Sequence, residues 1–151
     1  MTVEEVLTDS RELIIDQAYA ALDRAHPAHY EAVGEPVTRQ RLADLFDRVQ
    51  RAVHDRDLTP VVRAAEQIAE ERFHAGFDIS EVQTAFNALE EAMWRRVVAV
   101  EPPAELAECI GLLATVLGAG KDALARSYVS LASHRHVPSL DLSALFQGAT
   151  S

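Results

Sequence analysis

The stretch that decides the fold of this 151-residue chain is 71-ERFHAGFDISE-81, because it holds the end of one predicted helix and the start of the next. Gly76 stands just past the last periodic residue of the first helix, where a left-handed residue commonly ends a helix. Asp78 is placed to cap the second helix, and Glu81 follows three residues later, as a capping box requires. The sequence therefore predicts a structural turn at Gly76, Asp78 and Glu81.

The same stretch also has the spacing of a metal site, because Glu71 and His74 stand three residues apart. Di-iron helical bundles use a Glu-x-x-His pair on each of two helices and a glutamate from each of two others. This chain has no second Glu-x-x-His, and neither residue lies on the apolar stripe that contains Ile68. We therefore expect no metal, and we assign His74 to the solvated end of its helix, one turn after Glu70.

Outward from this turn, apolar residues recur every three or four positions, which is the period of an amphipathic helix. A capping box at Thr2 and Glu5 opens the first segment, residues 26–36 break the pattern as a loop, and no segment alternates with the period of a strand. The sequence predicts an all-α chain with a single helical-bundle or globin-like domain of about five main helices over residues 1–136. A short amphipathic C-terminal tail follows over residues 137–151.

Composition disfavours several classes of partner. Acidic residues outnumber basic ones by 24 to 14, which gives a net charge of −10 and disfavours nucleic acid and anionic membranes. The N-terminus lacks the pattern of a signal peptide, and the longest uncharged stretch, 109-CIGLLATVLGAG-120, is shorter than the ~20 residues that a membrane helix needs. A single cysteine, Cys109, suits a reducing compartment. We expect a soluble, cytoplasmic protein with no nucleic-acid or membrane partner.

No complete catalytic or cofactor-binding motif is present. The segment 118-GAGKD-122 lacks the glycine spacing, the following Ser or Thr and the preceding strand of a phosphate-binding loop. Cys109 borders an apolar stripe, as a small core residue would. Among the histidines only His54 lies at the edge of an apolar stripe, where a haem ligand could sit. We therefore expect no enzyme and no cofactor, with a sensor that binds haem or a small apolar ligand as the alternative.

Two features point to an interface. Gly111, Ala114 and Gly118, together with Thr115, give the last long helix a face of small residues, although glycine costs about 1 kcal/mol inside a helix. Close approach of another helix compensates that cost, either by internal packing or at a dimer seam. Trp94 lies on the polar face of the preceding helix, where it either anchors an interface or covers the edge of a neighbouring helix.

The C-terminal tail is amphipathic. Pro138 separates it from the last long helix, and Leu142, Leu145 and Phe146 then share one helical face. So short a helix is marginal in water and is expected to form only when this face docks. The alternative is a disordered terminus.

The segment 64-AAEQIAEERFHAGFDISEVQTAFNALEEAMWRRV-97, a helix that ends in a glycine turn before a second striped helix, resembles the sensory N-terminal domain of RsbR-type co-antagonist proteins of the bacterial stressosome. The resemblance extends through residues 13–36 and 113–132. It implies an all-helical, often dimeric input domain that binds no haem and passes a signal to a C-terminal output domain. After Leu131 about twenty residues remain, which is too few for such a domain and indicates a stand-alone regulator or an excised input domain.

These observations together favour a non-enzymatic bacterial signalling input or adaptor domain of the stress-response type. We expect a homodimer that acts through contacts with a regulatory protein partner. The expected interface residues are Trp94, Gly111, Ala114, Gly118, Leu142, Leu145 and Phe146.

Overall fold

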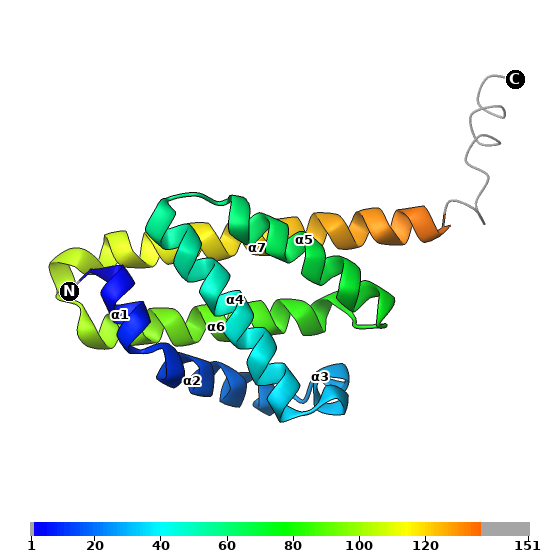
Figure 1. Cartoon of the computed structure of the whole chain (residues 1–151), viewed down its shortest axis with the longest axis horizontal. Helices are drawn as coiled ribbons and strands as arrows, with labels where there is room; N and C mark the ends of the chain where they lie inside the picture. The colour runs from blue at the N-terminus through cyan, green and yellow to red at the C-terminus, as the bar shows by residue number, and fades with distance from the viewer. Residues whose placement is uncertain (1, 137–151) are drawn as a thin grey trace, which may run out of the picture.

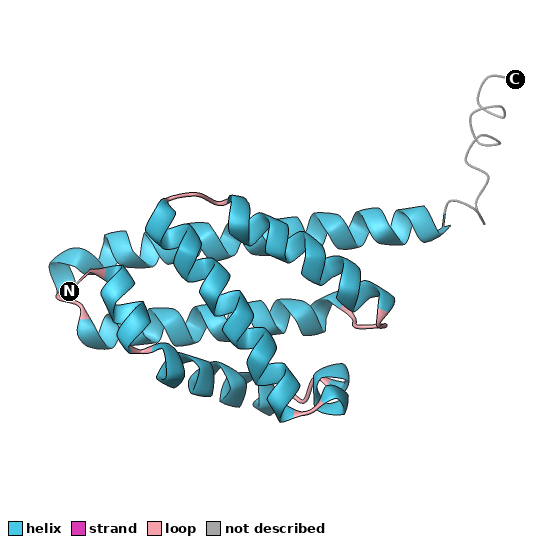
Figure 2. Cartoon of the chain, viewed as in Figure 1, coloured by secondary structure: helices cyan, strands magenta, loops and turns pink. Residues whose placement is uncertain are grey.

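The computed structural model describes residues 2–136, which form seven α-helices and no strand (Figures 1 and 2). The prediction of an all-α chain is confirmed, with seven helices in place of about five. Their bounds are α1 (Val3–Asp9), α2 (Arg11–Arg24), α3 (Ala28–Val33), α4 (Glu35–Asp55), α5 (Thr59–His74), α6 (Ile79–Val100) and α7 (Pro103–His136).

The first predicted helix is divided at Ser10, which ends α1 and begins α2. Ser10 is buried, and its Oγ accepts a hydrogen bond from Nε of Arg96 on α6 at 2.8 Å. A partner 86 residues away thus holds the bend. The apolar spacing continues across the bend, so local periodicity did not reveal it.

The prediction of a loop over residues 26–36 is wrong for the middle of this segment, which forms α3. His26 adopts a left-handed φ of +51° before the helix and Gly34 has a φ of +93° after it, so two sharp turns isolate a helix of six residues. Such a helix is too short to show a period of 3.6 residues. It buries one large side chain, Tyr30.

The most extensive packing joins α5 with α7, α2 with α6, and α6 with α7. The α6 and α7 helices run antiparallel on either side of a short turn, and α4 crosses in front of α6 (Figure 1). Leucine, valine and alanine fill most of the core, with Phe46 and Phe86 as its largest fully buried side chains.

The segment Pro103–Ser133 of α7 is the one helix among the described residues that is long and apolar enough to cross a membrane. Here it packs along α5 and α6 and buries Leu113, Leu117 and Leu124 completely or nearly so. A core helix of a soluble protein passes the same test of length and composition. The apolar character of α7 therefore does not distinguish a membrane helix from a core helix.

The turn between α5 and α6 satisfies the carbonyl groups that α5 leaves open. Gly76 has a φ of +87°, and its N–H donates to the carbonyl of Phe73 at 3.1 Å. The N–H of Phe77 donates to the carbonyl of Arg72 at 2.9 Å. These two bonds form a Schellman motif around a left-handed glycine.

Glu81 caps two helices at once. Asp78 and Glu81 form a capping box at the start of α6, with the Asp78 N–H 3.1 Å from Oε2 of Glu81. The other carboxylate oxygen accepts the backbone N–H of His29, in the first turn of α3, at 3.0 Å, and the His29 ring nitrogen Nδ1 lies 2.7 Å from Oε2. Burial raises the pKa of the Glu81 carboxyl, but the hydrogen bonds from His29 and Asp78 outweigh it and hold this pKa below its ordinary value.

Substituting valine at Gly76 is expected to lower the free energy of unfolding by about 1 kcal/mol or more, because a β-branched residue resists positive φ. An added Cβ would lie 3.7 Å from the nearest side-chain atom, so the cost comes from the backbone and not from a clash. Urea unfolding measures it. His74→Ala, at an exposed position two residues earlier, is the control and should change the free energy of unfolding little. If this control unfolds the protein, the assignment of residues 74–76 to a purely structural turn is wrong.

Replacement of Glu81 by glutamine should destabilise the protein by about 1 kcal/mol at neutral pH, because a charged cap of two helix N-termini is lost. Since the folded-state pKa of Glu81 is lowered, its contribution is present above the unfolded pKa of about 4.3 and disappears as pH falls through the lower folded value. The stability difference between wild type and variant should therefore shrink between about pH 5 and pH 3. Glu66→Gln, at an exposed position on α5, controls for the general loss of a surface carboxylate; a difference that stays constant over this range would exclude the charged double cap.

Candidate functional site

Trp94, Val98, Gly111, Ala114 and Gly118 are all accessible on α6 and α7, and we refer to them as the α6–α7 surface. Trp94 is 37% exposed and Val98 is 45% exposed, Gly111 and Ala114 are exposed, and Gly118 is partly exposed. Apart from the adjacent backbone of α7, a Cβ built on Gly111 or Gly118 would meet nothing within 4 Å among the residues that the structure describes. These two glycines therefore serve no close internal packing, and that alternative from the sequence is wrong.

The close internal approach occurs instead at Gly120. A Cβ there would lie 3.2 Å from side-chain atoms of both Phe86 and Val61. Close packing in the core thus accounts for Gly120, whereas Gly111 and Gly118 face outward. Two residues along a helix amount to a rotation of about half a turn, which separates the two kinds of glycine.

Trp94 and the small residues of α7 border the same seam. Lys121 of α7 contacts Oε1 of Glu90 at 2.9 Å and Oδ1 of Asn87 at 3.1 Å, both on α6. Trp94 lies one turn beyond Glu90, and Gly118 lies one turn before Lys121. Because α6 and α7 are antiparallel, the step from Glu90 to Trp94 and the step from Lys121 to Gly118 lead in the same direction. Trp94 and the small residues of α7, which the sequence presented as separate features, therefore belong to one surface.

The Trp94 ring is held in part by its neighbour. The guanidinium of Arg95 lies 5.3 Å from the ring centroid, and Nε of Arg95 is 2.8 Å from Oε1 of Glu91. These contacts orient the indole without covering it. Val129, farther along α7, is 66% exposed, so apolar exposure on α7 continues beyond the seam.

The remaining predicted interface residues, Leu142, Leu145 and Phe146, lie outside the described residues, as does the whole tail 137–151. Their proposed role remains a prediction from the sequence.

Within residues 2–136, no three His, Cys, Asp or Glu side chains are grouped so that they could hold a metal ion. Glu71 is exposed and bonds to Gln67 and Arg72, 3.3 Å away in each case. His54, the candidate haem ligand, is exposed on α4 and does not face the core. The structure does not support a haem site at that residue.

Cys109 is buried at the start of α7. Burial raises the pKa of its thiol, and the negative charges of Glu101 and Glu105 raise it further. The thiol is therefore kept protonated, as a small core residue would be, and is a poor nucleophile.

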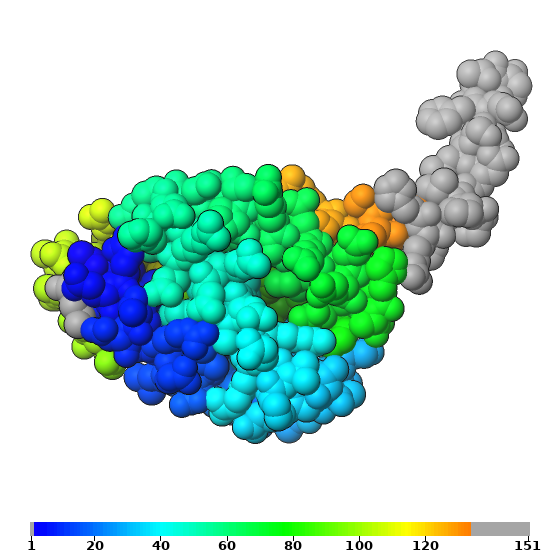
Figure 3. Space-filling model, in the orientation of Figure 1, coloured from blue at the N-terminus to red at the C-terminus, as the bar shows by residue number. Residues whose placement is uncertain are grey.

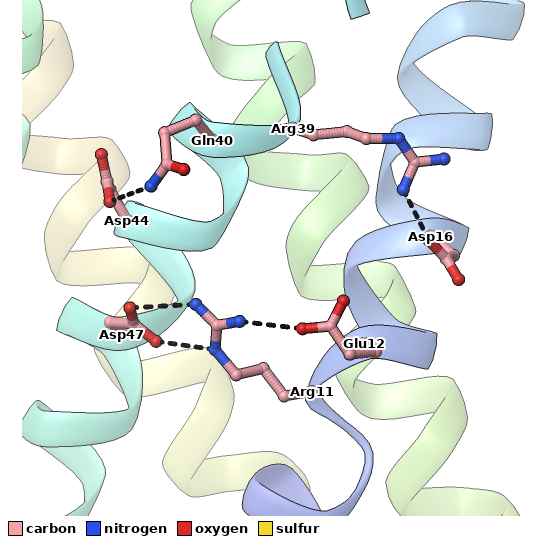
Figure 4. A network of polar contacts seen from close by, with 7 residues as sticks. All are labelled: Arg11, Glu12, Asp16, Arg39, Gln40, Asp44 and Asp47. Atoms are coloured by element: carbon pink, nitrogen blue, oxygen red, sulfur yellow. Dashed lines mark hydrogen bonds and ion pairs between the residues drawn. The ribbon is translucent and has the colours of Figure 1, made fainter. Parts of the chain in front are cut away.

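A polar network that the sequence did not reveal joins α2 to α4 (Figure 4). Arg11 reaches both carboxylate oxygens of Asp47, at 3.0 and 3.1 Å, and also Glu12. Arg39 pairs with Asp16. The Asp47 carboxylate raises the pKa of Arg11, so this pair remains charged and fixes the two helices without offering chemistry.

No curated protein and no solved structure matches the chain. Residues 11–136 match the family model described as the RsbT co-antagonist protein rsbRD N-terminal domain. The match begins with α2 and ends with α7, so it includes the double cap of Glu81 and the α6–α7 surface. The chain belongs to the family of RsbT co-antagonist rsbRD N-terminal domains, which are stress-response signalling domains of the stressosome type.

Proposed function

We propose that this chain is a non-enzymatic input or adaptor domain that acts through protein contacts, first with a second copy of itself. The family supports the signalling role. The observation that carries the contact is the α6–α7 surface, where a partly exposed tryptophan lies beside a row of residues with little or no side chain.

Small residues allow two helices to approach closely, and the approach restores the packing that glycine gives up inside a helix. A self-complementary contact would place α7 against α7 of the second copy, with Trp94 at its border as a buried aromatic anchor. The chain carries a net charge of −10, so two copies repel each other over most of their surface. The five residues that define the α6–α7 surface are uncharged, and the charged residues at its border form opposite-charge pairs, Arg95 with Glu91 and Lys121 with Glu90, which reduces that repulsion there.

The regulatory partner is proposed on the family description, which names co-antagonism of RsbT. We infer a bacterial, cytoplasmic protein that binds neither nucleic acid nor membrane, because its acidic balance disfavours both.

The proposed dimer is tested with Gly111→Leu and Trp94→Ala. A Cβ at position 111 meets nothing within 4 Å in the described part of the chain, so leucine there should leave the monomer fold intact while it separates the two copies. Light scattering at micromolar concentration should show a dimer for wild type. Each variant should weaken association by about 2 kcal/mol, roughly 30-fold in dissociation constant. Val37→Ala, which shortens an exposed side chain on α4, should remain dimeric; a monomeric wild type would exclude this interface.

Truncation after His136 tests the tail. If the apolar face of Leu142, Leu145 and Phe146 docks on the bundle or on the second copy, truncation should lower the melting temperature or the dimer fraction, because about 0.8 kcal/mol is lost for each CH2 group that leaves a buried site. The matched control is Leu145→Ser with Phe146→Ser in the full-length chain, which should reproduce the effect. An unchanged melting curve and mass would exclude docking on this protein.

A further inference from the structure

A groove of about 580 Å³ lies between α4 and α5. The two helices diverge from the loop at residues 56–58, and the surface is hollowed between them (Figure 3). Six charged side chains line the groove: Arg41, Asp44, Asp47, Arg48, Glu71 and Arg72. Its volume is typical of sites that hold small molecules, which occupy about 300–1,000 Å³.

Arg41 of α4 and Arg72 of α5 converge on one aromatic ring. Their guanidinium carbons lie 5.8 and 5.7 Å from the centroid of Phe77. Arg72 is 6% exposed, and its Nε is buried without a hydrogen-bond partner among the described residues. Nη1 of Arg41 is buried and unpartnered in the same sense. Burial lowers the pKa of Arg41, and the nearby charge of Arg72 lowers it further.

Two of the three carboxylates of the groove have partners outside the pair of arginines. Asp47 is bound by Arg11, and Asp44 accepts from Gln40 at 3.0 Å, so both are engaged with the α2–α4 side (Figure 4). Glu71 contacts Nη1 of Arg72 at 3.3 Å and leaves Nε of that arginine unpaired. The described contacts give Arg41 no carboxylate partner. Glu71 is thus the one carboxylate of the groove beside Arg72, and its charge also raises the pKa of Arg41. Two guanidinium groups share this single negative charge, and burying the excess positive charge without a further counterion is costly.

We propose that the α4–α5 groove binds a small anionic molecule whose carboxylate or phosphate group bridges Arg41 and Arg72. Guanidinium groups present planar, paired donors that match the oxygens of both anions, and such charge-assisted bonds are the strong ones. Burial raises the pKa of the Tyr30 phenol, and the charge of Arg72, a side-chain hydrogen bond with Arg72 and the charge of Arg41 lower it in part, so the phenol is a close neighbour of both arginines. The remainder of the molecule would occupy the groove toward Arg48.

The opposing interpretation is that Arg41 and Arg72 are structural and serve only to flank Phe77. The two interpretations differ in one variant. Arg41→Gln removes a half-buried charge that repels Arg72. If the two arginines form an anion-binding site, this variant should have an unchanged or higher melting temperature in the absence of anion. A purely structural Arg41 predicts a lower melting temperature in every buffer.

The experiment is thermal unfolding and calorimetric titration of the full chain with sodium phosphate and, separately, with succinate, against sodium chloride at equal ionic strength and pH. Wild type should show a saturable rise in melting temperature with at least one of the two anions, because a ligand that binds only the folded state stabilises it. Arg41→Gln should weaken binding at least tenfold. Arg126→Gln, which removes an exposed cation paired with Asp122 on α7, should bind like wild type and controls for net charge.

Phosphate also stabilises proteins by exclusion from their surface, and that part of the effect is shared by wild type and Arg41→Gln. No saturable binding of either anion to wild type, or equal binding to wild type and Arg41→Gln, would overturn the proposal. The inference is independent of the proposed dimer: Trp94→Ala should bind the anion as wild type does, so failure of one proposal is distinguishable from failure of the other.

Discussion

The left-handed turn at Gly76 is the constraint on which the rest of the structure depends, because it delivers Phe77 to the junction of four helices. The Phe77 ring lies 4.9 Å from the rings of both His29 and Tyr30 on α3. The two arginines of α4 and α5 flank it, and the carbonyl of Phe77 accepts a hydrogen bond from the hydroxyl of Tyr128 on α7 at 3.2 Å. A side chain that strains the backbone at position 76 would therefore disturb the contacts of Phe77 with all four helices.

The parts of this junction that could be predicted are those whose partners are close in sequence. A left-handed glycine, an N-cap and a glutamate at the third helical position act within a few residues of each other, so their spacing reveals them. The second role of Glu81, as a cap for α3, depends on a histidine 52 residues earlier and has no local signal. The bend at Ser10 is of the same kind, because Arg96 holds it from α6.

The interface residues illustrate a different limit. A glycine inside a helix indicates that something approaches closely, and periodicity alone does not say what. Only the packed structure separates Gly120, which faces Phe86 and Val61, from Gly111 and Gly118, which face outward. The same holds for Arg41 and Arg72, which are 31 positions apart in sequence and come to the same Phe77 ring only in the folded chain.

Helix α7 runs from the corner that holds Phe77 to the α6–α7 surface. Tyr128 touches the corner that holds Phe77, and Gly118 lies ten residues earlier on the same helix, about 15 Å away at the rise of an α-helix. A straight helix moves as one body, so a displacement of α7 against α5 at Tyr128 would also displace the seam at Gly118. A ligand between the arginines changes association only if it binds two arrangements of α7 with different affinity. The most extensive packing in the molecule includes that of α5 with α7, and closely packed helices have discrete arrangements and not a continuous range. Any coupling between the groove and the surface would therefore require a second packing of α5 on α7.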